Sequence, residues 1–184
     1  MSDLNDKCLE LFPKWLGSLG EDLRIFVGAL RAPNLSEEAK RYLLGGVNYL
    51  FKSLDLIPDG IDDIGYLDDA FVLRLSAKGA VSGDVGELPV SLREQLSALS
   101  EACALIEDFL GEGVYKRLQK YTDHLRNGAA RGRMVNEMVT HADTLGELLK
   151  DAEQFIESYE APSFAHDEKN LIKMTAFFEA KLPK

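Results

Sequence analysis

Apolar residues recur at helical spacing from the start of the chain. Residues 4–15 place their apolar side chains on one face, because steps of three and four residues return to the same side of an α-helix. Gly17 and Gly20 then interrupt the pattern, and a second short helix is expected over residues 23–32, ending before Pro33. The pattern therefore predicts two helices in this region.

Two further helices are predicted on either side of an acidic loop. One covers about residues 36–51 and carries Gly45 and Gly46 in its middle. Because such a pair weakens a helix, we expect a close contact with another helix or a kink there. The second helix covers about residues 67–80. Between them, turn-forming Pro, Asp and Gly residues predict an ordered loop.

A glycine-rich stretch over residues 79–89 marks the best boundary in the chain. It divides an N-terminal helical module, residues 1–88, from a C-terminal part, residues 89–184. We expect the two parts to pack as one unit.

The C-terminal part is more regular than the N-terminal part. Apolar residues alternate in steps of four and three over residues 92–110, 114–125 and 134–159. This spacing is typical of antiparallel helical bundles and short coiled coils. A last helix is expected around residues 171–178, and no strand-like alternation is found. The fold class predicted is all-α: a helical module with an Asp-rich helix–loop–helix, followed by an antiparallel bundle or hairpin.

Charge narrows the range of partners. The 184 residues include 31 acidic and 21 basic ones, for a formal net charge of −10. Such a chain repels nucleic acid and anionic membranes, so a nucleic-acid partner is not expected. One basic block opposes this trend with a single acid, Asp123, inside it. Its members are Lys116, Arg117, Lys120, Arg126, Arg131 and Arg133.

Two interpretations of the basic block are open. It can contact an anion or an acidic partner surface. Alternatively, its side chains pair with the many acids of the same chain, which the composition favours.

The cysteines and the termini predict a cytoplasmic protein. Cys8 and Cys103 lie far apart within helical apolar patterns, as expected for reduced, buried thiols. No secretory signal pattern and no transmembrane-length apolar stretch are visible.

No familiar catalytic motif is present. The sequence lacks a phosphate-binding glycine loop, a nucleophile elbow and a zinc-spaced Cys or His pair. Glu137 and His141 are four residues apart on one expected helix, but the rest of a di-iron set is missing. We therefore expect His141 to be a hydrogen-bonded residue at the edge of the core. The sequence leans against an enzyme and assigns no reaction.

The most distinctive stretch consists of two short strings, Asp-Leu-Ile-Pro-Asp at residues 55–59 and Gly-Tyr-Leu-Asp-Asp at residues 65–69. Together they resemble the YkvA-like family, a short bacterial and archaeal domain of unknown function. The resemblance covers about residues 41–78. It implies a helical domain without an established reaction. It also implies membrane association, which Lys52, Asp62 and Asp63 oppose in this chain.

Three interpretations of the aspartates are open. They can organise the turn, with Asp68 or Asp69 capping the following helix and Asp55 and Asp59 accepting hydrogen bonds from loop N–H groups. This interpretation is favoured. A second is a divalent cation site of the Mg²⁺ or Ca²⁺ type, for which Asp55, Asp59, Asp68 and Asp69 are the candidate ligands. The third and weakest is a paired-carboxylate hydrolase.

The leading hypothesis for function is a non-enzymatic interaction or scaffold module. Two interpretations of the helix expected over residues 134–159 are open. Core packing within a bundle is favoured. The alternative is a partner surface, for another protein or a second copy, with Met134 and Met138 as adaptable contacts. The alternative function is a metal-binding protein or metal-dependent enzyme centred on the aspartates. A weaker alternative is peripheral membrane contact through the apolar stretch at residues 43–57.

Overall fold

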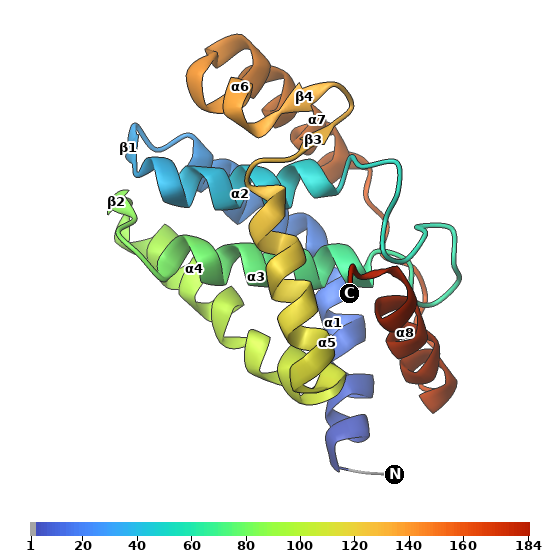
Figure 1. Ribbon diagram of the computed structural model, residues 1–184. Helices are drawn as coiled ribbons and strands as arrows, with labels where there is room; N and C mark the ends of the chain where they lie inside the picture. Colours follow the sequence, from blue (N-terminus) through green and yellow to red (C-terminus); the bar gives the residue numbers. More distant parts are fainter. Residues whose placement is uncertain (1–2) are drawn as a thin grey trace.

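The structure is a computed structural model that describes residues 3–184, and its architecture is all-α, as predicted. Four very short strands form two small antiparallel ladders between the helices (Figure 1). In chain order the elements are α1 (Asp3–Leu30), β1 (Asn34–Leu35), α2 (Glu37–Tyr49), α3 (Leu67–Val81), β2 (Gly86–Glu87), α4 (Val90–Glu101), α5 (Cys103–Leu125), β3 (Ala129–Ala130), β4 (Arg133–Met134), α6 (Val135–Thr140), α7 (Ala142–Ser158) and α8 (Glu168–Lys181).

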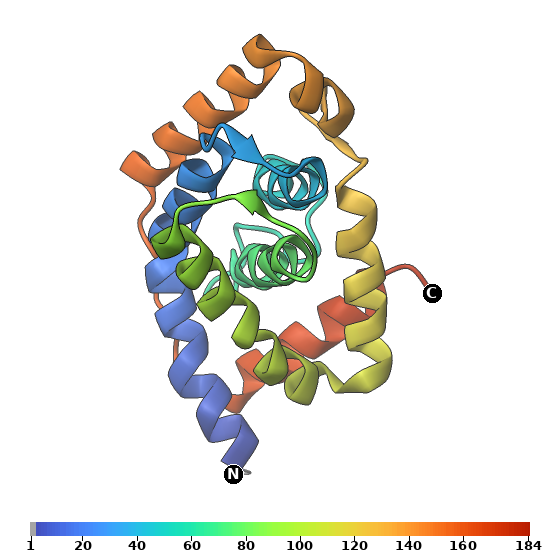
Figure 2. The same ribbon diagram turned by 90° about the vertical axis from the view of Figure 1, so that its left-hand side faces the viewer.

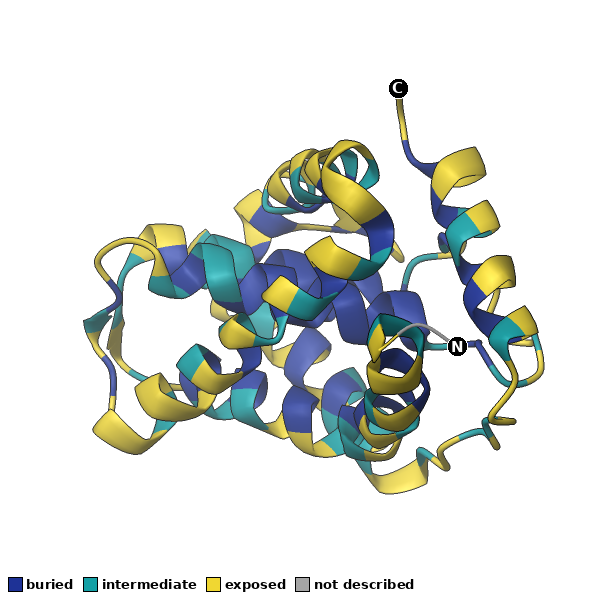
Figure 3. Cartoon of the chain, turned by 90° about the horizontal axis from the view of Figure 1, so that it is seen from below, coloured by how far each residue is buried: buried dark blue, intermediate teal, exposed yellow. Residues whose placement is uncertain are grey.

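A hairpin of two helices, α2 and α3, occupies the centre of the molecule. Figure 2 shows both nearly end-on, with α1, α4, α5, α8 and the α6–α7 pair arranged around them. Every residue from Leu67 to Ala77 in α3 is buried. Most of these residues are apolar, as expected for a helix enclosed by protein, but Asp68, Asp69 and Arg74 are buried among them. The surrounding helices instead bury only their inner faces (Figure 3).

The glycine pair in α2 permits two close approaches, as the sequence predicts. A Cβ atom at Gly45 would lie 2.8 Å from the carbonyl carbon of Leu125, at the end of α5. A Cβ atom at Gly46 would lie 2.7 Å from the Ser76 hydroxyl of α3. These separations are shorter than normal contacts, so a larger residue would force the helices apart.

The first helix differs from the prediction. The two expected N-terminal helices are one continuous helix, α1, which contains Pro13, Gly17 and Gly20. Its buried face carries large side chains such as Phe12 and Phe26. Packing of this face on the core outweighs the modest helix penalty of the glycines.

The prediction of one long helix over residues 134–159 is also wrong. It is divided at His141, whose extended backbone (φ −118°, ψ 112°) separates α6 from α7. His141 is exposed, and its Nδ1 lies 2.8 Å from the Thr140 hydroxyl. It therefore marks a helix end and does not lie at the edge of the core.

Two further glycines shape the C-terminal part of the chain. Gly111 has a φ of 74° and produces a kink inside α5. Gly132 has a φ of 75° and lies in the turn between β3 and β4. The strands themselves were not predicted. Asn34 and Leu35 of β1 pair with β2, which ties the segment before α2 to the segment after α3.

Helices on both sides of residues 79–89 contact one another extensively. The C-terminal α7 packs on α1, α6 packs on α2, and α8 packs on α1 and α5. One apolar core runs through these contacts. Within it Cys8 and Cys103 are buried and free, and burial raises the pKa of each thiol to about 11.

Candidate functional site: buried carboxylates beneath the acidic loop

The loop between α2 and α3 is tightly folded. The Ile61 N–H donates to the Pro58 carbonyl over 3.0 Å, and the Gly65 N–H donates to the Ile61 carbonyl over 2.9 Å. A Cβ atom at Gly65 would lie only 2.3 Å from the Asp59 carbonyl oxygen. Glycine is therefore required where the loop closes on itself. Its apolar residues Leu56 and Ile57 are buried, so the loop packs on the core as expected.

Asp68 holds this loop against the helices. Its Oδ2 accepts a hydrogen bond from the Tyr49 hydroxyl at 2.6 Å and another from the Ile57 N–H at 2.9 Å. The Tyr49 hydroxyl in turn accepts from the Leu56 N–H at 2.8 Å. All four groups are buried, and so each partner satisfies a polar group that would otherwise be costly to enclose.

Asp69 lies in a different environment from its neighbour. Its side chain is 2% exposed, and its Oδ2 is buried without a hydrogen-bond partner. Asp68 Oδ1 and Asp55 Oδ1 are also buried and unpartnered. Among residues 3–184, no lysine, arginine or histidine forms an ion pair with Asp55, Asp59, Asp68 or Asp69. These four residues are called the acidic cluster below.

Burial and mutual repulsion favour the protonated forms of the acidic cluster. Burial, followed by the charge of Asp59, raises the pKa of Asp55 to about 6. Burial raises the pKa of Asp59. Burial also raises the pKa of Asp68, although the hydrogen bonds from Tyr49 and Ile57 oppose the shift. Burial and the neighbouring carboxylates raise the pKa of Asp69 well above its ordinary value.

The outer side of the loop is held by the C-terminal part of the chain. Asp63, with a φ of 71°, accepts hydrogen bonds from the Ala165 N–H and the Asn170 side chain. Tyr66 also has a positive φ, 66°, and its ring packs edge-on against Phe155 of α7 and against Tyr159, which follows α7 directly. These contacts keep two unfavourable backbone conformations in place.

The structure changes how the aspartates organise the turn. The residue before α3 is Tyr66, and no side chain caps this helix, so neither Asp68 nor Asp69 acts as the cap. Both lie in its first turn, near the positive end of the helix dipole. The Ile57 N–H of the loop donates its hydrogen bond to Asp68, a residue of α3, and not to Asp55 or Asp59.

The acidic cluster is not arranged as a finished metal site. Over the described chain, residues 3–184, no group of three or more Asp, Glu, His or Cys side chains is placed to hold one ion. Asp55 and Asp59 lie on the loop and are partly accessible, whereas Asp68 and Asp69 are fixed in α3.

A second buried charge, not singled out from the sequence, lies on α3 one turn further on. Arg74 is 3% exposed, and its Nη2 lies 3.1 Å from Asp22 Oδ2 of α1. Its Nη1 donates to the Ala70 carbonyl, and its guanidinium lies 4.2 Å from the centre of the Trp15 ring. Spacing alone could not reveal this pair, because its members are distant in sequence.

The basic block is dispersed by the fold. Arg126 approaches Glu38, and both Arg131 and Arg133 approach Asp151. Arg117 donates to the carbonyl of Glu179 in the last turns of α8 and to those of Leu182 and Pro183 just beyond it. These four of the six side chains thus connect α5 and the β3–β4 turn to other elements of the chain.

The remaining members of the block, Lys116 and Lys120, are exposed on α5. Lys116 pairs with Glu112 on the same helix, and Lys120 forms no ion pair with the described residues.

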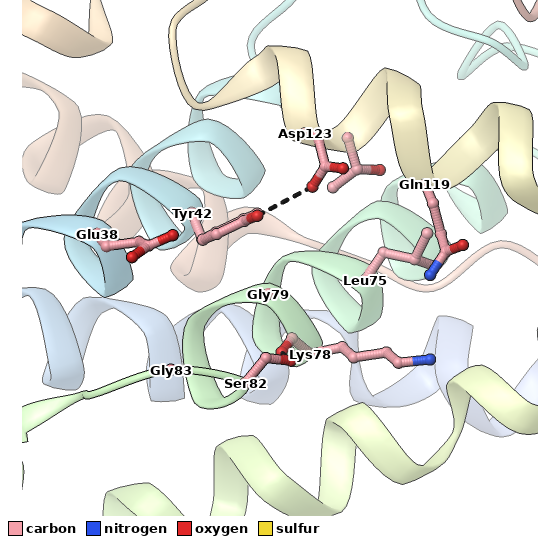
Figure 4. A pocket seen from close by; sticks show the side chains of 10 residues that line it. Glu38, Tyr42, Leu75, Lys78, Gly79, Ser82, Gly83, Gln119 and Asp123 are labelled. Atoms are coloured by element: carbon pink, nitrogen blue, oxygen red, sulfur yellow. Dashed lines mark hydrogen bonds between the residues drawn. The ribbon is translucent and has the colours of Figure 1, made fainter.

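A polar pocket of about 280 Å³ lies where α2, α3 and α5 meet (Figure 4). The Tyr42 hydroxyl points across it to Asp123, to which it donates over 3.0 Å. The Tyr42 ring packs so closely on Gly79 that a Cβ atom there would lie 2.4 Å from it. Thr122, buried with an unpartnered hydroxyl, also lines the pocket. Because Glu38, Asp123 and Lys78 all line the pocket, it does not favour a ligand of either charge.

Comparison with known proteins supports the resemblance seen in the sequence. Residues 39–75 match the model of one protein family, described as "Protein of unknown function (DUF1232)". This is a family of the same type as the YkvA-like one. The matched segment contains α2 from its third residue, the acidic loop and α3 as far as Leu75. No curated protein and no solved structure matches the chain.

The comparison leaves the function unknown, because the matching family has no assigned activity. The structure also addresses whether a helix of the chain could span a membrane. Within residues 3–184, no helix combines the length and the apolar character needed to cross a bilayer.

Proposed function

We propose that the acidic cluster binds a divalent cation and that this ion controls the stability of the loop. The observation that carries the proposal is the set of three buried, unpartnered carboxylate oxygens on Asp55, Asp68 and Asp69. Buried acceptors without partners are rare in folded proteins. A cation would satisfy them and remove the repulsion among the carboxylates.

Each member of the cluster has a distinct part in this proposal. Asp69 offers a free oxygen from a fixed position in α3. Asp68 keeps one oxygen engaged with Tyr49 and Ile57 and offers the other. Asp55 and Asp59 supply further carboxylates from the loop. Binding would therefore rotate the loop side chains toward α3 and tighten the turn.

The donor set favours a hard cation. All four candidate ligands are carboxylates, which suit Mg²⁺ or Ca²⁺. Both cysteines lie elsewhere in the core, so a thiolate site for a softer metal is not supported. The free, buried thiols fit a reducing compartment, and we include a cytoplasmic location in the proposal.

A thermal-melt titration tests the proposal. Wild type, stripped with a chelator, is titrated with Mg²⁺, Ca²⁺, Mn²⁺ and Zn²⁺ near pH 7.5. An ion that binds only the folded state raises the melting temperature with its concentration. We expect Mg²⁺ or Ca²⁺ to do so, and we expect Asp69→Asn and Asp59→Asn to abolish the increase.

The matched control is Asp62→Asn, which removes an exposed acid from the same loop. It should leave the cation response intact. If no ion shifts wild type, or if Asp62→Asn weakens the response as much as Asp69→Asn does, the cluster is not the binding site.

The interaction-module hypothesis has weaker support. The apolar stripe of α6 and α7, which would form a partner surface, contributes Met138 and Leu148 to the core, and both are fully buried. Met134 remains 43% exposed. A partner would therefore have to bind outside this stripe. Concentration-dependent assembly in analytical ultracentrifugation, reduced by Met134→Lys, is the result that would favour this hypothesis.

A further inference from the structure

Two hollows lie end to end along α5, on the side that faces the C-terminal tail. One, of about 430 Å³, is lined by Lys116, Arg117, Lys120, Tyr121, His124, Pro183 and Lys184. The other, of about 210 Å³, lies toward α2 and the β3 strand. Tyr121 and His124 line both hollows. Together they are called the basic groove.

Most of the positive charge of the basic groove is not neutralised by carboxylates; the exception is Lys116, which pairs with Glu112 on the same helix. No acidic side chain lines either hollow. Lys52, which lines the second hollow, donates to the Tyr121 hydroxyl, a neutral group. Arg117 donates to backbone carbonyls, which also leave its charge uncancelled. The side chains of Lys120 and His124 make no hydrogen bond or ion pair with any residue from 3 to 184.

This surface contrasts with the rest of the molecule. Elsewhere, cations such as Arg31, Arg41 and Arg126 form ion pairs with glutamates. In a chain with ten more acids than bases, a hollow lined only by basic and neutral groups concentrates positive potential. Such a concentration attracts a small anion more than it attracts a neutral molecule.

The second hollow has a different character. Its lining includes Gly45, Leu125, Ala129 and Ala130, with Lys52 at one edge. Asn48 also lines it and is 3% exposed. The Asn48 amide donates to the Arg133 carbonyl over 3.2 Å, while its Oδ1 is buried and accepts no hydrogen bond. This end of the groove therefore has an unused acceptor buried behind its lining, which a ligand reaches only when the Asn48 side chain shifts.

We propose that the basic groove binds a small organic phosphate. The phosphate lies at the end formed by Lys116, Lys120 and Lys184, since ammonium groups bind phosphate as point charges. The uncharged part lies over Tyr121, and a shift of the Asn48 side chain brings Oδ1 within reach of its hydrogen-bond donor. The site is independent of the acidic cluster, and the functional residues of the basic block are the two exposed lysines, of which Lys116 exchanges its exposed partner Glu112 for the phosphate.

Isothermal titration with three probes tests the proposal: inorganic phosphate, ribose 5-phosphate and ribose. We expect ribose 5-phosphate to bind more tightly than phosphate, and ribose not to bind. The double variant Lys116→Gln/Lys120→Gln should weaken both phosphates about tenfold, because two exposed charges are lost. Affinity should fall as salt is added, because the groove is open to solvent.

Two further variants separate the groove from general effects of charge. Lys150→Gln/Lys173→Gln removes two exposed lysines from α7 and α8, outside the groove, and should leave both affinities unchanged. Asn48→Ala should weaken ribose 5-phosphate and spare inorganic phosphate. Each variant is compared with wild type by its melting temperature, so that a folding defect is recognised.

Some results would overturn the proposal. These are equal weakening in the control variant, equal binding of ribose and ribose 5-phosphate, or binding of polyglutamate but of neither phosphate. The last result would assign the groove to an acidic protein segment. Failure here would leave the cation proposal untouched, since the cation titration uses different residues and a ligand of opposite charge.

Discussion

The helix α3 carries two buried charge systems that differ in one respect. Arg74 meets Asp22 at 3.1 Å, so a cation is supplied by the chain itself. Asp68 and Asp69, one to two turns earlier, are equally buried but have no basic partner among the described residues. Burying a lone charge is unfavourable unless a proton or an ion neutralises it. The first system therefore has its charges paired within the chain and is called complete below, although Arg74 Nε is buried without a hydrogen-bond partner. The second, incomplete system depends on a proton or an ion from the solution.

Breaking the complete system should have the largest effect. Arg74→Met leaves the Asp22 carboxylate buried without its cation, and we expect the free energy of unfolding to fall by about 3–5 kcal/mol. Urea denaturation measures the change. The double variant Asp22→Leu/Arg74→Met should recover most of the loss, because it removes both charges. A single variant as stable as wild type would show that the pair contributes little.

An intermediate effect is expected where the incomplete system is tied to the loop. Tyr49→Phe removes the hydroxyl that donates to Asp68 and accepts from the Leu56 N–H. The Leu56 N–H then has no partner, which costs about 1–3 kcal/mol for a buried group. Denaturation of this variant should be compared with Tyr42→Phe, whose hydroxyl meets the exposed Asp123. Equal losses would mean that burial of the Tyr49 network adds nothing.

The pH dependence of the free energy of unfolding provides a further test of the acidic cluster. In the absence of cations, the acidic cluster binds protons more tightly in the folded state than in the unfolded state, since the pKa values of its members are raised. Its contribution to stability is fully present below pH 4. It is then lost as the pH rises through the folded pKa values, including that of Asp55 at about 6. The free energy of unfolding should therefore decrease between pH 4 and 7, by at most ~1.4 kcal/mol per pH unit for each proton.

Asp69→Asn is the variant that tests this slope. It removes one titrating group, so the decrease should be shallower and the protein should be more stable than wild type at pH 8 without cations. The smallest effect is expected for Asp62→Asn, within about 0.5 kcal/mol at any pH, as for most surface substitutions. A steeper slope in Asp69→Asn would contradict the raised pKa of Asp69.

The sequence predicts regular elements well where the local pattern decides them. The two helices on either side of the acidic loop and the close approach at Gly45 are confirmed. It fails where tertiary packing overrides local signals. Gly17 and Gly20 lie inside one helix because the buried face of α1 continues through them.

The candidate sites show the same limit. The sequence identified the aspartates but not which of them are buried, since burial depends on how the loop folds back on α3. It could not pair Asp22 with Arg74, 52 positions apart. It grouped six basic residues by proximity in sequence, whereas the fold joins Lys116 and Lys120 with Lys52 and Lys184.

The burial of α3 on every side has a consequence for the family match. The matched segment, residues 39–75, is the inner hairpin of this molecule and has little exposed surface of its own. A peptide of this length would present apolar side chains to water in every direction and would aggregate. The segment that matches the family is therefore a core hairpin that depends on surrounding helices to cover it. Residues outside the match supply those helices, so their composition determines the solubility of the protein.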